Sequence, residues 1–69
     1  MPEYTLAFRV NGQFLFHPPL KAATMRAAIE AANAPTVEGA MALIGSLEAR
    51  EKGLFEYKNG SWGLNRLAK

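Results

Sequence analysis

Hydrophobic and polar residues alternate near both ends of the chain, which is the pattern of half-buried β-strands. Each alternating stretch is interrupted by an Asn-Gly dipeptide, at residues 11–12 and 59–60. Asparagine and glycine accept the positive φ that both central positions of a two-residue hairpin turn require. The sequence therefore predicts two antiparallel hairpins, with Arg9 opposite Phe14 in the first and Tyr57 opposite Trp62 in the second.

The first hairpin has apolar residues on both of its faces. Alternation puts Tyr4, Leu6, Phe8, Val10 and Leu15 on one face, and Thr5, Ala7, Arg9, Phe14 and Phe16 on the other. The first set is the more continuously apolar, so it is the predicted core face. We expect Pro18-Pro19 to end the second strand because proline cannot donate to a ladder.

Apolar residues spaced three and four apart predict two helices in the middle of the chain. The first helix is expected to run from between Leu20 and Thr24 to about Asn33, and the second from about Val37 to Lys52. Thr36 would cap the second helix, and Gly53 would stop it. The predicted fold class is α+β in the order ββααββ, two antiparallel hairpins packed with two helices in a single domain over residues 1–69.

The second predicted helix has an unusual outward side. The residues on this side are small and uncharged, namely Gly39, Ala42, Ser46 and Ala49. A solvated face normally carries more charge than this. Small residues permit close approach of another surface, so this side is a candidate contact surface.

Composition leaves little room for catalysis. The 69 residues are 49% hydrophobic and 20% charged, which is typical of a folded domain, but there is no cysteine, no aspartate and a single histidine, His17. Glu48 and Glu51 lie one helical turn apart beside Lys52, which is typical of a solvated helix end. Since neither a triad nor a metal site can be assembled, we predict no enzyme activity, no metal and no cofactor.

Charge and hydropathy point to a cytoplasmic protein. No apolar run approaches the roughly 18 residues of a membrane span, and no charged-then-apolar export signal is present. The net charge is +2. No acid follows Glu56, whereas Lys58, Arg66 and Lys69 do, so the C-terminal hairpin is the basic end of the chain.

Residues 25–64 also follow a recognisable order. The segments are Met25–Asn33, the Ala34-Pro35 break, the second predicted helix with Leu47-Glu48-Ala49-Arg50, then Gly53-Leu54-Phe55, Gly60, Trp62 and Leu64. This order resembles the helix-turn-helix and wing of winged-helix domains. The resemblance implies DNA binding, with the second helix in the major groove and Lys58, Asn59, Ser61, Arg66 and Lys69 as contact residues.

Contact with another protein is the function that the residues favour. An aromatic cluster beside an arginine is typical of an interface centre, and the small-residue side of the second helix is unpartnered. The predicted contact residues are Arg9, Phe14, Phe16, Gly39, Ala42, Ser46 and Ala49. We predict a small regulatory or inhibitory module that contacts a protein partner or itself, with no membrane and no small-molecule substrate.

Two alternatives involve nucleic acid. A winged-helix-like regulator would use the second helix and the basic C-terminal hairpin, although Thr36-Val37-Glu38-Gly39 lacks the side chains that read bases. Phe14 and Phe16 beside Arg9 could instead stack single-stranded bases. The size and alanine-rich composition suit a bacterial or phage regulator, including, by analogy, the anti-CRISPR inhibitors.

Overall fold

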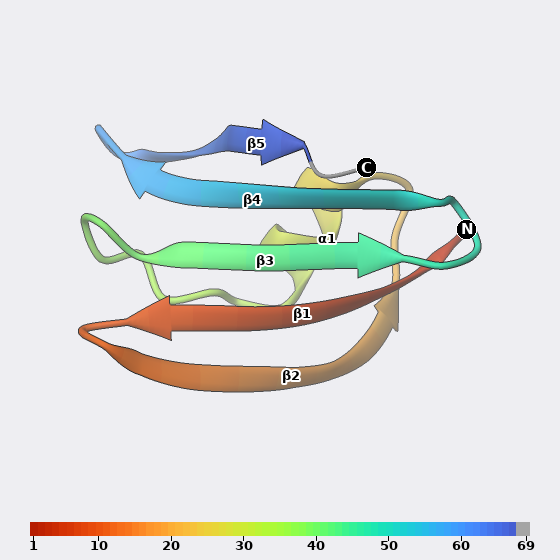
Figure 1. Ribbon diagram of the computed structural model, residues 1–69, viewed down its shortest axis with the longest axis horizontal. Coiled ribbons are helices and arrows are strands. Elements are labelled where there is room, and N and C mark those ends of the chain that lie inside the picture. Colours follow the sequence, from red (N-terminus) through yellow and green to blue (C-terminus); the bar gives the residue numbers. More distant parts are fainter. Residues whose placement is uncertain (68–69) are drawn as a thin grey trace.

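A five-stranded antiparallel sheet dominates the fold (Figure 1). The computed structural model describes residues 1–67 and the side chains of residues 1–65. The elements in chain order are β1 Glu3–Val10, β2 Gln13–Lys21, α1 Met25–Ala31, β3 Met41–Ser46, β4 Glu51–Lys58 and β5 Ser61–Leu67. The strand order is β2-β1-β3-β4-β5, so β3 runs between the two hairpins and joins them into one sheet.

Both predicted hairpins are confirmed, together with their registers. Asn11 and Gly12 have φ angles of 51° and 79°, and Asn59 and Gly60 have 55° and 81°, as two-residue hairpin turns require. Arg9 pairs with Phe14 across the first turn. Across the second turn, Tyr57 pairs with Trp62 and Phe55 pairs with Leu64, as expected.

The predicted end of the second strand at Pro18-Pro19 is wrong. Strand β2 continues to Lys21, with a register shift opposite the prolines, where Leu6 pairs with His17 and Tyr4 pairs with Leu20. Neither proline has a backbone N–H, and the register shift lies where these two donors are missing. The shift absorbs the missing bond without ending the strand.

The predicted second helix over residues 37–52 is wrong, and with it the ββααββ fold class. These residues form the end of a loop, all of β3, a turn at residues 47–50 and the start of β4. Gly39 has a φ of 86° and Arg50 a φ of 54°, values that a right-handed helix does not contain. In β3, Ala42, Ile44 and Ser46 are buried and alternate with more exposed residues, which is the period of a strand.

The one helix of the described chain, α1, confirms the first helical prediction with a shorter span. Thr24 caps it, since its Oγ1 accepts a hydrogen bond of 3.0 Å from the backbone N–H of Ala27. Ala28 and Ile29 are completely buried against β1 and β3. Ala42 of β3 is also fully buried, and its small side chain lets the helix approach the sheet closely.

The core therefore lies on one side of the sheet only. Its largest members are Tyr4, Leu6, Phe8, Ile29, Ile44, Phe55 and Trp62. In Figure 1, α1 and the loop after it lie behind the sheet, and the near side carries no covering element. The single short helix of residues 1–67 is not long and apolar enough to cross a membrane.

Candidate protein-contact surface

The uncovered side of the sheet, here called the outer face, contains residues from all five strands. Its residues are Thr5, Ala7 and Arg9 of β1, Phe14 and Phe16 of β2, Met41, Leu43 and Gly45 of β3, Lys52, Leu54 and Glu56 of β4, and Gly63 of β5. These residues alternate along each strand with the core residues on the other side. The outer face is therefore a continuous surface that no part of residues 1–67 covers.

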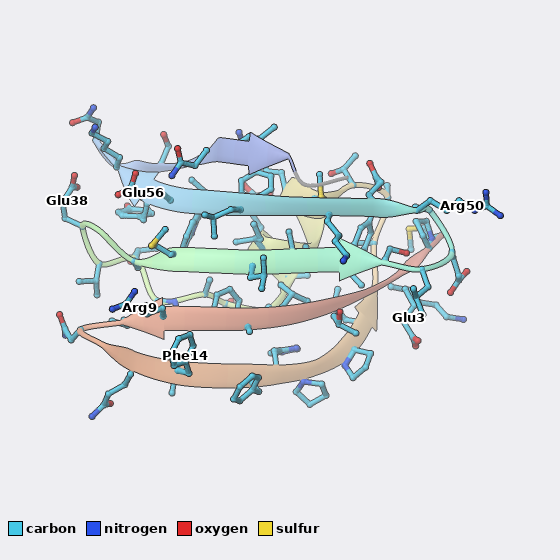
Figure 2. All side chains as sticks on the ribbon, in the orientation of Figure 1. Glu3, Arg9, Phe14, Glu38, Arg50 and Glu56 are labelled. Atoms are coloured by element: carbon cyan, nitrogen blue, oxygen red, sulfur yellow. The ribbon has the colours of Figure 1, made fainter. Side chains whose placement is uncertain are left out.

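Two phenylalanines form the aromatic end of the outer face. Phe16 is 80% exposed and Phe14 is 64% exposed. The Arg9 guanidinium carbon lies 5.9 Å from the centroid of the Phe14 ring, within the range of a cation–π contact. Figure 2 shows Phe14 and Arg9 on neighbouring strands, on the side turned toward the viewer. This contact holds Arg9 over the sheet and leaves Phe16 free to touch another molecule.

The centre of the outer face is aliphatic and hollowed. Leu43 is 57% exposed, and Leu54 pairs with it from β4. One shallow hollow of about 210 Å³ is lined by Ala7, Arg9, Phe14, Met41, Leu43 and Leu54. A larger one of about 500 Å³ runs beside Phe16, Leu43 and Lys52. Exposed leucine and phenylalanine around hollows are typical of a surface that another protein covers.

Charged residues flank this apolar centre at defined register positions. Arg9 pairs with Met41, which in turn pairs with Glu56, so strand β3 separates the two charges. Figure 2 shows Arg9 and Glu56 near the same end of the sheet, on strands on either side of β3. Lys52 pairs with Gly45 and Gly45 with Thr5, four residues further along the strands. The outer face thus has an apolar middle bordered by both signs of charge.

The structure brings together some of the predicted contact residues and separates the rest. Arg9, Phe14 and Phe16 share the outer face. The second predicted contact set, Gly39, Ala42, Ser46 and Ala49, forms no surface, because the helix that would have aligned it does not exist. Ala42 and Ser46 are buried on the core side, and the Ser46 hydroxyl accepts a hydrogen bond of 3.1 Å from the backbone N–H of Ala49.

Several outer-face residues escaped the sequence reasoning. The predicted second helix places Met41 and Leu43 in its core-facing apolar stripe, and Leu54 just beyond its end at Gly53. Burial alternates along Met41–Ser46 in the structure, but the residue types do not, so the strand period could not be recognised from this segment alone.

The predicted nucleic-acid contacts gather only in part. Lys58, Asn59 and Ser61 lie at the turn between β4 and β5. Their neighbour there is an acid, since Glu38 Oε2 accepts a weak 3.5 Å hydrogen bond from the backbone N–H of Asn59. Lys69 and the side chain of Arg66 lie outside the described residues. DNA binding stays a prediction, and residues 37–52 provide no helix to enter the major groove.

Polar groups elsewhere in the described chain have structural partners. Arg26 donates a hydrogen bond to the backbone carbonyl of Trp62 and so ties α1 to β5. His17 lies on an edge strand, with its Nδ1 2.7 Å from the Pro18 carbonyl oxygen. Within residues 1–67, no three side chains of metal-ligand type come together.

One titratable group departs clearly from its ordinary pKa, and it belongs to the core. Burial raises the pKa of Tyr4 to about 12, and the hydrogen bond from its hydroxyl to Glu51 Oε1, 2.7 Å long, adds to the effect, as does the charge of Glu51. Tyr4 points away from the outer face and is only 1% exposed. The shift therefore reflects burial in the core and does not mark a reactive site.

Comparison of the chain with protein-family models, with curated proteins and with solved structures found no match. Function is therefore inferred from the geometry of the chain alone.

Proposed function

We propose that this protein is a small, non-catalytic cytoplasmic module that acts by protein contact through the outer face of its sheet. The observation that carries the proposal is the exposure of Phe14, Phe16 and Leu43 on one continuous, uncovered face. A chain of this size has little apolar surface to spare for its own core. Leaving three large apolar side chains in water is costly unless a partner covers them, at about 25 cal/mol per Å² buried.

The type of surface supports protein contact over other kinds of ligand. Aromatic anchors, an arginine and aliphatic hollows in the middle, with charge at the margins, match the anatomy of protein interfaces. A regulator or inhibitor that works by occupying a surface needs no catalytic group. The outer face fits that role because its apolar side chains and hollows can bind a partner by shape complementarity and by burial of apolar surface.

A photo-cross-linking experiment tests the proposal. A photoactivatable amino acid replaces Leu43 at the centre of the outer face, and the matched control carries it in place of Leu47, which is 96% exposed in the turn after β3. We expect a protein adduct from position 43 in cells of the host, and none from position 47. We further expect the paired substitutions Phe14→Ser and Phe16→Ser to abolish that adduct while leaving the circular dichroism spectrum unchanged.

The proposal fails on either of two results. Absence of any protein adduct from position 43 would show that nothing covers the outer face. An adduct that persists in the Phe14→Ser, Phe16→Ser chain, or that forms equally from position 47, would show that the contact does not depend on this surface.

A further inference from the structure

We infer that the partner of the outer face is a second copy of this chain, packed face to face about a twofold axis that runs along β3. This inference rests on the proposed function and names the molecule that covers the surface. Homodimers most commonly have twofold symmetry, which requires that a surface be complementary to its own image. The residue order across the outer face meets that requirement.

The axis along β3 determines which residues meet. Since β3 is the middle strand of the order β2-β1-β3-β4-β5, rotation about it places β1 of one copy over β4 of the other and β2 over β5. The rotation does not change a residue's position along the strand direction, so each residue faces one that lies at the same height along the strands of the other copy. Stacked sheets lie about 10 Å apart and cross by about 30°, which shifts pairs one strand from the axis by only about 2–3 Å.

Opposite charges meet in this arrangement. Arg9 and Glu56 both lie level with Met41, one strand to either side of β3. The rotation therefore sets Arg9 of each copy over Glu56 of the other, which creates the same ion pair twice. Lys52 meets Thr5, so no two like charges face each other among the outer-face residues named above. Such charge complementarity suppresses wrong registers and favours one orientation.

Large side chains also meet small ones. Ala7 and Leu54 both lie level with Leu43, on opposite sides of β3, so Leu54 of one copy fills the space above Ala7 of the other. Phe14 of one copy meets Gly63 of the other in the same way. Phe14 on β2 is level with Arg9, and Gly63 on β5 is level with Glu56. Leu43 packs on its own symmetry mate at the axis. Interlocking of this kind is what close-packed interfaces need.

A twofold axis perpendicular to the strands does less well. An axis through Leu43 in that direction sets Leu54 on Leu54 and Ala7 on Ala7, which crowds one pair and leaves a gap at the other. It also sets Arg9 over Thr5 and Glu56 over Lys52, so it creates an ion pair twice, as the axis along β3 does, but from different residues. Side-chain size therefore favours the axis along β3, and the identity of the ion pair distinguishes the two axes in an experiment.

The area of the outer face suits a dimer of modest affinity. The molecule measures 30 × 21 × 18 Å along its principal axes, and the sheet lies across the two longer ones (Figure 1). Full overlap would cover roughly 600 Å² per copy in projection, against about 800 Å² per partner in a standard stable interface. We therefore expect a dimer with a dissociation constant in the micromolar range.

Charge reversal tests both the partner and the axis, with sedimentation equilibrium of the purified protein from about 1 μM to 1 mM as the measurement. The monomer has a mass of 7.5 kDa, and we expect the wild type to approach twice that mass. Arg9→Glu alone, or Glu56→Arg alone, places like charges together twice and should raise the dissociation constant at least about tenfold. The double variant should return to within about threefold of the wild type.

Mixing gives the sharpest prediction. Arg9→Glu chains and Glu56→Arg chains, each weakened alone, should form a mixed dimer when combined, because every contact across the axis then pairs opposite charges. The matched controls reverse charges away from the outer face, with Arg50→Glu in the turn after β3 and Glu30→Arg on α1. Both controls should dimerise like the wild type, and circular dichroism should show every variant folded.

Three results would overturn the inference, the first by excluding the dimer and the other two by excluding its axis along β3. The first is a wild type that stays at 7.5 kDa over the whole range. The second is a double variant that is not rescued. The third is disruption by Glu56→Arg without disruption by Arg9→Glu, which is the pattern of the perpendicular axis. A monomer that still forms a face-dependent cross-link from position 43 to another protein would refute the second copy and retain the protein-contact function.

Discussion

Replacing Tyr4 with phenylalanine should make the stability of the fold less sensitive to alkaline pH. Tyr4 is buried, and its hydroxyl donates a 2.7 Å hydrogen bond to Glu51. Burial, then the hydrogen bond and the charge of Glu51, raise the pKa of this hydroxyl from 10.0 to about 12. Because the folded state holds the proton more tightly, this group's stabilisation is complete below pH 10 and is lost as the pH rises toward 12.

The magnitude follows from the two pKa values. One unit of difference is worth 1.36 kcal/mol, so at pH 11, midway between the two values, the wild type should have lost about 1.4 kcal/mol through this group. Tyr4→Phe removes the hydrogen bond and should cost about 1 kcal/mol at neutral pH. The stability gap between the two proteins at neutral pH should therefore close, within error, by pH 11.

Urea denaturation followed by the fluorescence of Trp62, the single tryptophan, measures both free energies of unfolding. Each pair of proteins is compared at one protein concentration, since association also affects stability. The absorbance of tyrosinate, titrated in the wild type and in Tyr4→Phe, gives the ionisation of Tyr4 as the difference. Glu51→Gln keeps an acceptor but removes the charge, so it should weaken the alkaline loss.

The explanation is refuted if the gap between wild type and Tyr4→Phe is the same at pH 8 and pH 11. A difference titration with its midpoint near 10 would refute it independently, because it would mean that neither burial nor Glu51 acts on the hydroxyl.

Four further substitutions, the last of them a control, test the stability of the fold. Ile29→Ala removes a fully buried side chain of α1 and should cost about 2–5 kcal/mol of unfolding free energy, enough to unfold much of the protein at 37 °C in a thermal melt. Thr24→Ala deletes the helix cap and should cost about 1 kcal/mol by urea titration. Gly60→Ala places a Cβ at a φ of 81° and should cost about 1 kcal/mol, whereas Leu47→Ser, in an exposed turn, should change stability by less than about 0.5 kcal/mol.

Local signals explain the parts of the fold that sequence reasoning predicted. The Asn11-Gly12 and Asn59-Gly60 turns set the registers of both hairpins, because a two-residue turn leaves one way to pair the flanking strands. The placement of Phe14 and Phe16 together on the face opposite the core followed from the same register. These three features depend on residues close together in the chain.

The prediction failed where distant segments decide the structure. Over residues 37–47, the apolar spacing fits a helix, and alanine favours one. Gly39 and Gly45 inside such a helix would each cost about 1 kcal/mol, and this was the one local warning. What makes Met41–Ser46 a strand is pairing with β1 on one side and β4 on the other, and neither pairing can be read from a turn.

The candidate surface, too, could be predicted only where it depends on residues close together in the chain. Arg9, Phe14 and Phe16 could be grouped from one hairpin, whereas Leu43 and Glu56 join them only once the strand order is known. The contact set predicted for the second helix failed for this reason as well. Ala42 and Ser46 are small because α1 and the core side need the room, and not because a partner approaches them.

The two consecutive prolines of β2 have a consequence for how copies of this protein can accumulate. An open sheet edge invites further strands, and chains that add edge to edge build fibres without limit. Pro18 and Pro19 have no backbone N–H, so a strand that arrives at this part of the edge meets a gap in the ladder. The proline end of β2 is thus a poor template for a further strand, which disfavours edge-to-edge stacking there for a protein with exposed phenylalanine and leucine.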